Sequence, residues 1–177
     1  MPRKIRVSRA TAADAALLAA LHAASFERSH ERPLESPWRE EDMAKFIAGP
    51  GTLCLIGLTG DTEPAPSGLL IACQAADEAE LLTIGVVPEC RRLGLGRTLL
   101  QHALAGLRTG GAKRLFLEVD ETNTGAVALY HALGAEPVGR RPRYYESGAD
   151  AAIFSLALSV PHSDDARSAH EPREDQR

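Results

Sequence analysis

The sequence has few cysteines, and neither a disulfide framework nor a metal site is indicated. Only three occur among 177 residues, at Cys54, Cys73 and Cys90, and none belongs to a C-x-x-C pair. The six histidines show no H-x-x-x-H spacing. Disulfide scaffolds need paired cysteines, and zinc sites need closely spaced cysteine or histidine ligands. We therefore expect no metal, and the unpaired thiols favour a reducing cytoplasm.

The sequence also lacks the features of membrane and nucleic-acid partners. No apolar run approaches the ~20 residues of a membrane helix. The basic residues near the N-terminus are not followed by a continuous hydrophobic segment, so we expect no signal peptide. A net charge of −4 gives no basic footprint for nucleic acid. With 44% hydrophobic residues, the chain can build one domain with a sizeable core.

Hydrophobic periodicity predicts a mixed α+β fold with a mostly antiparallel central sheet flanked by helices. The expected strands are 3–9, 52–59, 68–77, 79–88, 114–120, 135–140 and 152–158. The expected helices are 12–26, opened by a capping box of Thr11 and Asp14, 39–48, 94–107 and 124–133. Polar, proline-rich stretches at 27–38 and 60–67 are expected to connect them. We expect one domain over 1–160 and a disordered polar tail over 161–177.

Residues 81–99 predict a strand followed by an anion-binding helix start. The apolar strand breaks at Pro88, and the segment RRLGLG (91–96) leads into an amphipathic helix. The first N–H groups of a helix have no partner within it, and the helix dipole is positive there. Together with the flanking arginines, this favours a ligand rich in phosphate.

The spacing of the glycines excludes two common phosphate-binding motifs. A dinucleotide-binding G-x-G-x-x-G would need a third glycine where Leu99 stands, and the G-K-[ST] of a mononucleotide loop occurs nowhere. What remains is R-x-x-G-x-G, which begins at Arg91. This pattern resembles the pyrophosphate loop of the GCN5-related N-acetyltransferase (GNAT) family. The resemblance extends over about residues 3–158 and implies acetyl-coenzyme A (acetyl-CoA) as co-substrate.

Acetyl transfer from a thioester to an amine needs a base for the amine and an acid for the departing thiolate. Alternation in RLFLEVD (114–120) puts Glu118 on the face opposite Leu117, where it could be a base or a solvated residue. Tyr130 shares an apolar helix face, where it could be an acid or a core aromatic. Asn123 could cap that helix or bind a cofactor amide.

The segment LEVDETNTGAVALYHALGA (117–135) resembles the ribosomal-protein alanine N-acetyltransferases of this family, the RimI type. That resemblance implies Glu118 as catalytic base and Tyr130 as catalytic acid. It further implies that the pantetheine arm follows the strand and that the pyrophosphate meets the loop. The cofactor-binding residues so implied are Ile84, Gly85, Val86, Arg91, Arg92, Leu93, Gly94, Leu95, Gly96, Arg97 and Asn123.

The resemblance is weaker for the residues expected at the acceptor. Pro37-Trp38 and Arg143-Tyr144-Tyr145 resemble family segments, the latter near the acceptor peptide, but the loop before Pro37 is longer and Gly134-Ala135 replaces the usual G-F. The cluster Arg140–Arg143 could steer an acidic acceptor or be a solvated turn. We expect direct acetylation of a protein N-terminal α-amine, such as the N-terminal alanine of a small-subunit ribosomal protein. A small-molecule amine as acceptor, or an acyl-CoA sensor without turnover, remain the alternatives.

Overall fold

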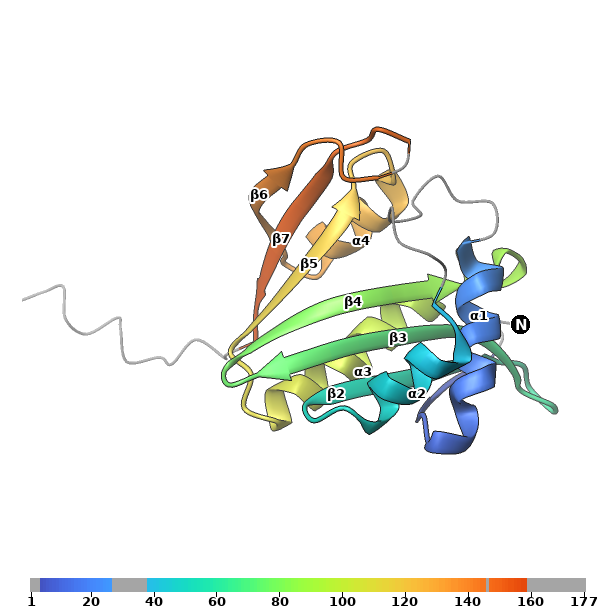
Figure 1. Ribbon diagram of the computed structural model, residues 1–177. Coiled ribbons are helices and arrows are strands. Elements are labelled where there is room, and N and C mark those ends of the chain that lie inside the picture. Colours follow the sequence, from blue (N-terminus) through green and yellow to red (C-terminus); the bar gives the residue numbers. More distant parts are fainter. Residues whose placement is uncertain (1–3, 27–37, 146, 159–177) are drawn as a thin grey trace, which may run out of the picture.

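The computed structural model describes residues 4–26, 38–145 and 147–158, which are organised around one seven-stranded sheet (Figure 1). Its strand order is β1-β2-β3-β4-β5-β7-β6. Within this described part, only β4 and β5 pair in parallel, and the other neighbours are antiparallel. The strands are β1 Ile5–Arg9, β2 Thr52–Thr59, β3 Ala65–Ala75, β4 Glu78–Val86, β5 Arg114–Asp120, β6 Glu136–Arg141 and β7 Ala151–Ala157. The predicted mixed, mostly antiparallel α+β fold is confirmed.

Helices cover both faces of the sheet and create two hydrophobic cores (Figure 1). Leu18 and Met43, from the first two helices, pack with Ile71 on one face, and Leu99 packs with Leu70 and Leu117 on the other. None of the helices in the described part of the chain combines the length and hydropathy that a membrane span requires. The helices are α1 Ala15–Phe26, α2 Glu40–Ala48, α3 Leu95–Thr109 and α4 Thr124–Ala132, with short 3-10 turns at Ala12–Asp14 and Pro88–Cys90.

The order of elements agrees with the prediction, and the differences lie at their ends. The connection expected over 60–67 is shorter, because Ala65 and Pro66 pair with β2 beyond a β-bulge. At the predicted helix start, the Asp14 carboxylate accepts hydrogen bonds from the Thr11 N–H (2.7 Å) and hydroxyl (2.8 Å). The first turn there is nevertheless a 3-10 turn. The predicted tail and almost all of the 27–38 connection lie outside the described residues.

The parallel strands β4 and β5 separate part of the way along their length, as Figure 1 shows. Their pairing ends at Leu81 and Leu117, although β4 continues to Val86 and β5 to Asp120. At this point β4 also contains a bulge: Leu81 pairs with Ala72 and Thr83 with Ile71. Because a bulge bends a strand and increases its twist, it directs the end of β4 away from β5. The result is a gap between two neighbouring strands.

Two strand glycines hold the start of α3 close to the sheet beside this gap. A Cβ on Gly57 would lie 2.7 Å from Leu95 Cδ1, and one on Gly68 would lie 3.1 Å from Leu95 Cδ2. Leu95 is the first residue of α3 and is fully buried between them. A larger residue at either position would force Leu95 or the helix start to shift, so the two glycines allow this close packing of α3 on the sheet.

Candidate active site

A cavity of about 650 Å³ lies where β4 separates from β5. Within the described residues, four segments form its wall: the end of α1, the end of β4, the loop and first turn of α3, and the turn before α4 together with one side of that helix. Eleven of the thirteen residues implied from the sequence line it: Ile84, Gly85, Val86, Arg91, Arg92, Gly94, Leu95, Gly96, Arg97, Asn123 and Tyr130. The two others, Leu93 and Glu118, do not line it.

The start of α3 presents backbone donors to the cavity. Gly94 has φ +89°, a left-handed conformation that glycine adopts without strain, and it turns the chain into the helix. Its carbonyl accepts the Thr98 N–H (3.0 Å), so the N–H groups of Leu95, Gly96 and Arg97 precede the first helical hydrogen bond. These groups and the positive end of the helix dipole favour an anion.

The arginines of the loop have different surroundings. Arg91 donates from Nε to the Val86 carbonyl (3.1 Å) and from Nη2 to the Ser25 carbonyl (2.7 Å), so its guanidinium ties the end of β4 to the end of α1. Arg92 and Arg97 line the cavity, where their charge can reach a phosphate. Leu93, which the resemblance included, is 45% exposed at the tip of the loop. Arg91 therefore has a structural contact in addition to its place in the cavity wall, and Arg92 and Arg97 add positive charge to that wall.

The end of β4 offers a strand edge to the cavity and lies close to α1. Ile84, Gly85 and Val86 extend beyond the last residue of β4 that pairs with β5. A Cβ on Gly85 would lie 2.7 Å from Ser25 Cβ, so only glycine lets α1 approach this closely. The Ser25 hydroxyl is buried and has no hydrogen-bond partner among the described residues, and Ser25 belongs to the cavity wall. No sequence signal distinguished Ser25, because its neighbours come from distant segments.

Tyr130 and Asn123 reach the cavity from α4. Tyr130 is 3% exposed, and its ring packs 6.3 Å from that of Phe154 in the core. Asn123 Oδ1 accepts the Ala126 N–H (2.9 Å), so the residue caps α4 and also lines the cavity. The Asp120 carboxylate accepts from the N–H and hydroxyl of Thr122 (2.7 Å each), which fixes the preceding turn. Asn123 is therefore a helix cap and Tyr130 a core aromatic, and both also line the cavity; the cofactor contact of Asn123 and the acid role of Tyr130 stay predictions.

Glu118 lies outside the cavity, on the other face of β5. Its neighbours Leu117 and Val119 are buried in the core with α3, so alternation directs Glu118 to the opposite face. Its side chain is 19% exposed, and Oε1 forms an ion pair with Arg141 Nε of β6 at 2.9 Å. Glu118 is therefore a half-buried carboxylate in an ion pair. The sequence had left open whether it is a base or a solvated residue, and its role as base stays a prediction.

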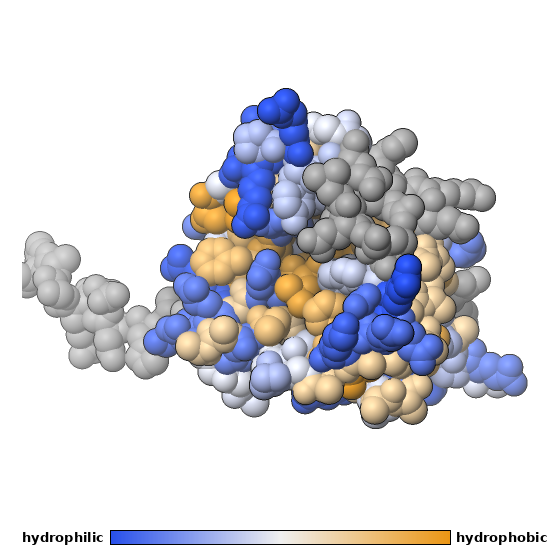
Figure 2. All heavy atoms as spheres, in the orientation of Figure 1, coloured by the Kyte–Doolittle hydropathy of each residue, from blue (hydrophilic) through white to orange (hydrophobic). Residues whose placement is uncertain are grey.

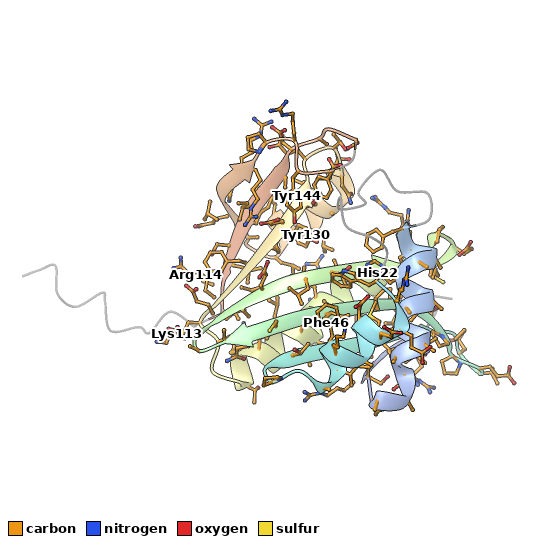
Figure 3. All side chains as sticks on the ribbon, in the orientation of Figure 1. His22, Phe46, Lys113, Arg114, Tyr130 and Tyr144 are labelled. Carbon is orange, nitrogen blue, oxygen red and sulfur yellow. The ribbon has the colours of Figure 1, made fainter. Side chains whose placement is uncertain are left out.

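Aromatic residues collect on this face across the gap from Glu118. The rings of His22 and Trp38 stack at 5.0 Å, and those of Trp38 and Phe46 lie 4.8 Å apart. In Figure 3, His22 and Phe46 belong to the α1–α2 part, whereas Tyr130 and Tyr144 belong to the part formed by β5, β6, β7 and α4. Figure 2 shows apolar side chains in the middle of this face with hydrophilic residues on both sides.

Neither a metal nor a cysteine nucleophile is indicated at the site. Among the described residues, no group of His, Cys, Asp and Glu side chains could hold a metal ion. Burial raises the pKa of the Cys54 thiol to about 11, so this thiol is protonated near neutral pH. Cys90 lines the cavity but is buried, with its sulfur 3.5 Å from the Thr59 hydroxyl oxygen.

The site thus combines a strand gap, a free strand edge and a glycine-bearing helix start, the features of a transferase that holds a phosphate-containing donor in extended form. A profile of the acetyltransferase (GNAT) family matches residues 19–135. The chain belongs to the GNAT family of acetyltransferases. The expected class of enzyme, an acetyl-CoA-dependent N-acetyltransferase, is confirmed.

Several relatives carry the same specific name. The [ribosomal protein bS18]-alanine N-acetyltransferase of Salmonella typhimurium is 38% identical over 128 residues, which make up 70% of this chain and 83% of the relative. The protein of that name from Escherichia coli K12 is 41% identical over 87 residues, 48% of this chain and 59% of the relative. The crystal structure of the ribosomal-protein-S18-alanine N-acetyltransferase from Escherichia coli superimposes with a TM-score of 0.71 at 31% identity, covering 91% of this chain and 98% of that one. The predicted resemblance to the RimI type is confirmed.

Proposed function

We propose that this protein transfers the acetyl group of acetyl-CoA directly to the N-terminal α-amine of a protein, with the N-terminal alanine of ribosomal protein S18 as the expected acceptor. One observation carries the proposal. A single cavity joins the anion-binding start of α3, the free edge of β4 and Tyr130. The names of the relatives from Salmonella typhimurium and Escherichia coli support the choice of acceptor.

The cavity wall suits the chemical parts of acetyl-CoA. The pyrophosphate would meet the N–H groups at the start of α3, with Arg92 and Arg97 nearby. The pantetheine arm contains amides and is extended, so it could pair with the edge of β4 at Ile84–Val86 as an added strand does. Asn123 and Ser25 would contribute further polar contacts.

In the proposed reaction, Glu118 and Tyr130 each move one proton. Glu118 accepts the proton that the α-amine must lose; because that amine has a pKa near ~8, a carboxylate acting directly or through water suffices. A bond forms between the neutral amine nitrogen and the thioester carbonyl carbon, the carbon–sulfur bond breaks, and the second proton that the nitrogen loses as the amide forms passes to solvent. The Tyr130 hydroxyl gives its proton to the departing sulfur. The strand gap is open between the donor cavity and the face that carries Glu118. The acceptor would therefore approach from that face and meet the donor at the gap.

The properties of the cysteines favour direct transfer over an acetyl-cysteine intermediate. A nucleophilic thiol must ionise near neutral pH, and the raised pKa of Cys54 opposes this. The sulfur of Cys90 is buried and contacts the Thr59 hydroxyl oxygen at 3.5 Å, which is not a base that could activate it. Neither thiol therefore has the surroundings of a covalent catalyst.

The test is acetylation of a peptide library by the whole protein with isotopically labelled acetyl-CoA, read by mass spectrometry. Peptides that begin with Ala are compared with the same peptides blocked at the N-terminus, and with free amino acids and other small amines. Label on the α-amine of peptides supports the proposal. Label only on small amines would replace the acceptor, and tight acetyl-CoA binding without transfer to any amine would make the protein a sensor.

The assignment of the base is tested separately. Glu118→Gln keeps the size of the side chain but removes its ability to accept a proton. We expect kcat to fall by about a hundredfold, the usual contribution of general base catalysis. The affinity for acetyl-CoA, measured by calorimetry, should not change, because Glu118 lies outside the cavity. An unchanged kcat would remove Glu118 as the base.

A further inference from the structure

Two neighbouring arginines of β6 have different partners. Arg140 forms ion pairs with Glu121 (2.7 Å), which directly follows β5, and with Asp150 (2.9 Å), which directly precedes β7. Arg141 forms its ion pair with Glu118, at 2.9 Å. The two arginine side chains are equally exposed, at 59%. Within the Arg140–Arg143 cluster, Arg140 therefore joins two loop carboxylates, whereas Arg141 contacts the candidate base.

The contact between Arg141 and Glu118 constrains the carboxylate on one side. Arg141 Nε meets Oε1, and no hydrogen bond or ion pair from the described residues engages Oε2, so Oε2 is the oxygen we expect to accept a proton from an incoming amine. The guanidinium carbon of Arg141 also lies 5.8 Å from the centre of the Tyr144 ring, within the range of a cation–π contact. Arg141 is thus held between an aromatic ring and the carboxylate.

Stability alone gives little reason for this arrangement. Ion pairs that involve exposed side chains contribute little to folding, because water screens them and two long side chains lose conformational freedom. Arg141 is such a side chain, whereas its partner Glu118 is only 19% exposed at the edge of the strand gap. The consequence of the pair is the fixed orientation of a half-buried carboxylate.

We propose that Arg141 is a positioning residue for catalysis: it holds Glu118 so that Oε2 faces the amine that is to be acetylated. The inference rests on the proposed role of Glu118 as base. Arg141 keeps its own proton throughout, and the proton from the amine goes to Glu118. A misplaced base lowers the rate of the chemical step without weakening the binding of the donor, since correct geometry at the reacting atoms is what the base contributes.

The experiment compares Arg141→Gln with Arg140→Gln in steady-state acetylation of an N-terminal peptide. Arg140 is the matched control, because it lies on the same strand, is equally exposed and loses two ion pairs. We expect Arg141→Gln to lower kcat by about tenfold or more with an unchanged KM for acetyl-CoA. Arg140→Gln should stay within about twofold of the parent enzyme. Arg141→Lys, which retains a cation, should recover part of the lost kcat.

A double substitution tests whether Arg141 acts through Glu118. In the Glu118→Gln background, adding Arg141→Gln should change kcat no further, because the base is already absent. The inference is overturned if Arg141→Gln matches Arg140→Gln, if lysine recovers nothing, or if the loss is equally large in the Glu118→Gln background. The role of Glu118 itself fails only if Glu118→Gln alone leaves kcat unchanged, so the two failures are distinguishable.

Discussion

The two sides of the strand gap are built in different ways. On the β4–α3 side, the site consists mainly of backbone: a strand edge, the N–H groups of a helix start, Gly85 where α1 approaches closely, and Gly94 with its positive φ. On the β5–β6 side, it consists of side chains, with Glu118 paired to Arg141 and Tyr130 packed on Phe154.

This difference corresponds to different tasks. A backbone cradle binds a phosphate-rich donor through groups that every residue carries, so only the conformation of the chain must be specified. Proton transfer needs particular side chains in particular orientations. Substitutions on the first side should therefore change donor binding, and substitutions on the second should change kcat. The predictions below test this division.

Tyr130→Phe should have the largest effect, on kcat alone. The substitution removes only the hydroxyl, while the ring can still pack near Phe154. Loss of a general acid typically costs about a hundredfold or more in rate. Single-turnover kinetics would measure the chemical step, with calorimetric binding of acetyl-CoA as the control. An unaltered rate would show that another group protonates the thiolate.

Gly85→Ala should weaken both folding and donor binding. The new Cβ would lie 2.7 Å from Ser25 Cβ and 3.0 Å from Leu69 Cδ2, so α1 must move away from β4. Overpacking of this kind costs about 1–3 kcal/mol in the free energy of unfolding. Gly139→Ala in β6 is the control, because its Cβ would meet Ile153 Cδ1 at an ordinary 3.4 Å. Equal denaturation midpoints for the two variants would contradict the close contact.

Ser25→Ala should have the smallest effect, on donor binding alone. The hydroxyl has no hydrogen-bond partner in the part of the chain that the structure describes, so its removal should not lower the free energy of unfolding. The dissociation constant for acetyl-CoA should rise about two- to tenfold if the ligand supplies the missing hydrogen bond.

Ser67→Ala provides the opposite control for Ser25. Ser67 is also buried, but its hydroxyl bonds Thr59 Oγ1 and the Ala65 carbonyl, each at 2.8 Å. The Ser67→Ala variant should lose about 1 kcal/mol in the free energy of unfolding and keep the affinity of the parent protein for acetyl-CoA. If both variants lose stability and neither loses affinity, Ser25 has only a structural role.

Most of the fold could be predicted because its signals are local. Alternating apolar residues and glycine or proline stops gave every strand and helix in order, and the Thr11–Asp14 capping contacts were visible from their spacing. The extension of β3 back to Ala65 was missed because pairing with β2 outweighs the turn-forming tendency of Pro66. For the motif residues the structure adds contacts that the spacing did not show: the Arg91 side chain donates to two carbonyl groups, and Leu93 is exposed.

The sequence by itself determined the order of elements and the glycine-bearing start of α3, and it predicted which residues would serve acetyl transfer. Each depends on residues within a few positions of one another, whose geometry local backbone conformation dictates. Only the tertiary structure decided the partner of Glu118, the role of Arg91 and the place of Ser25. Arg141 lies 23 positions from Glu118 and Ser25 lies 66 from Arg91, so these contacts exist only because the strands and helices pack as they do.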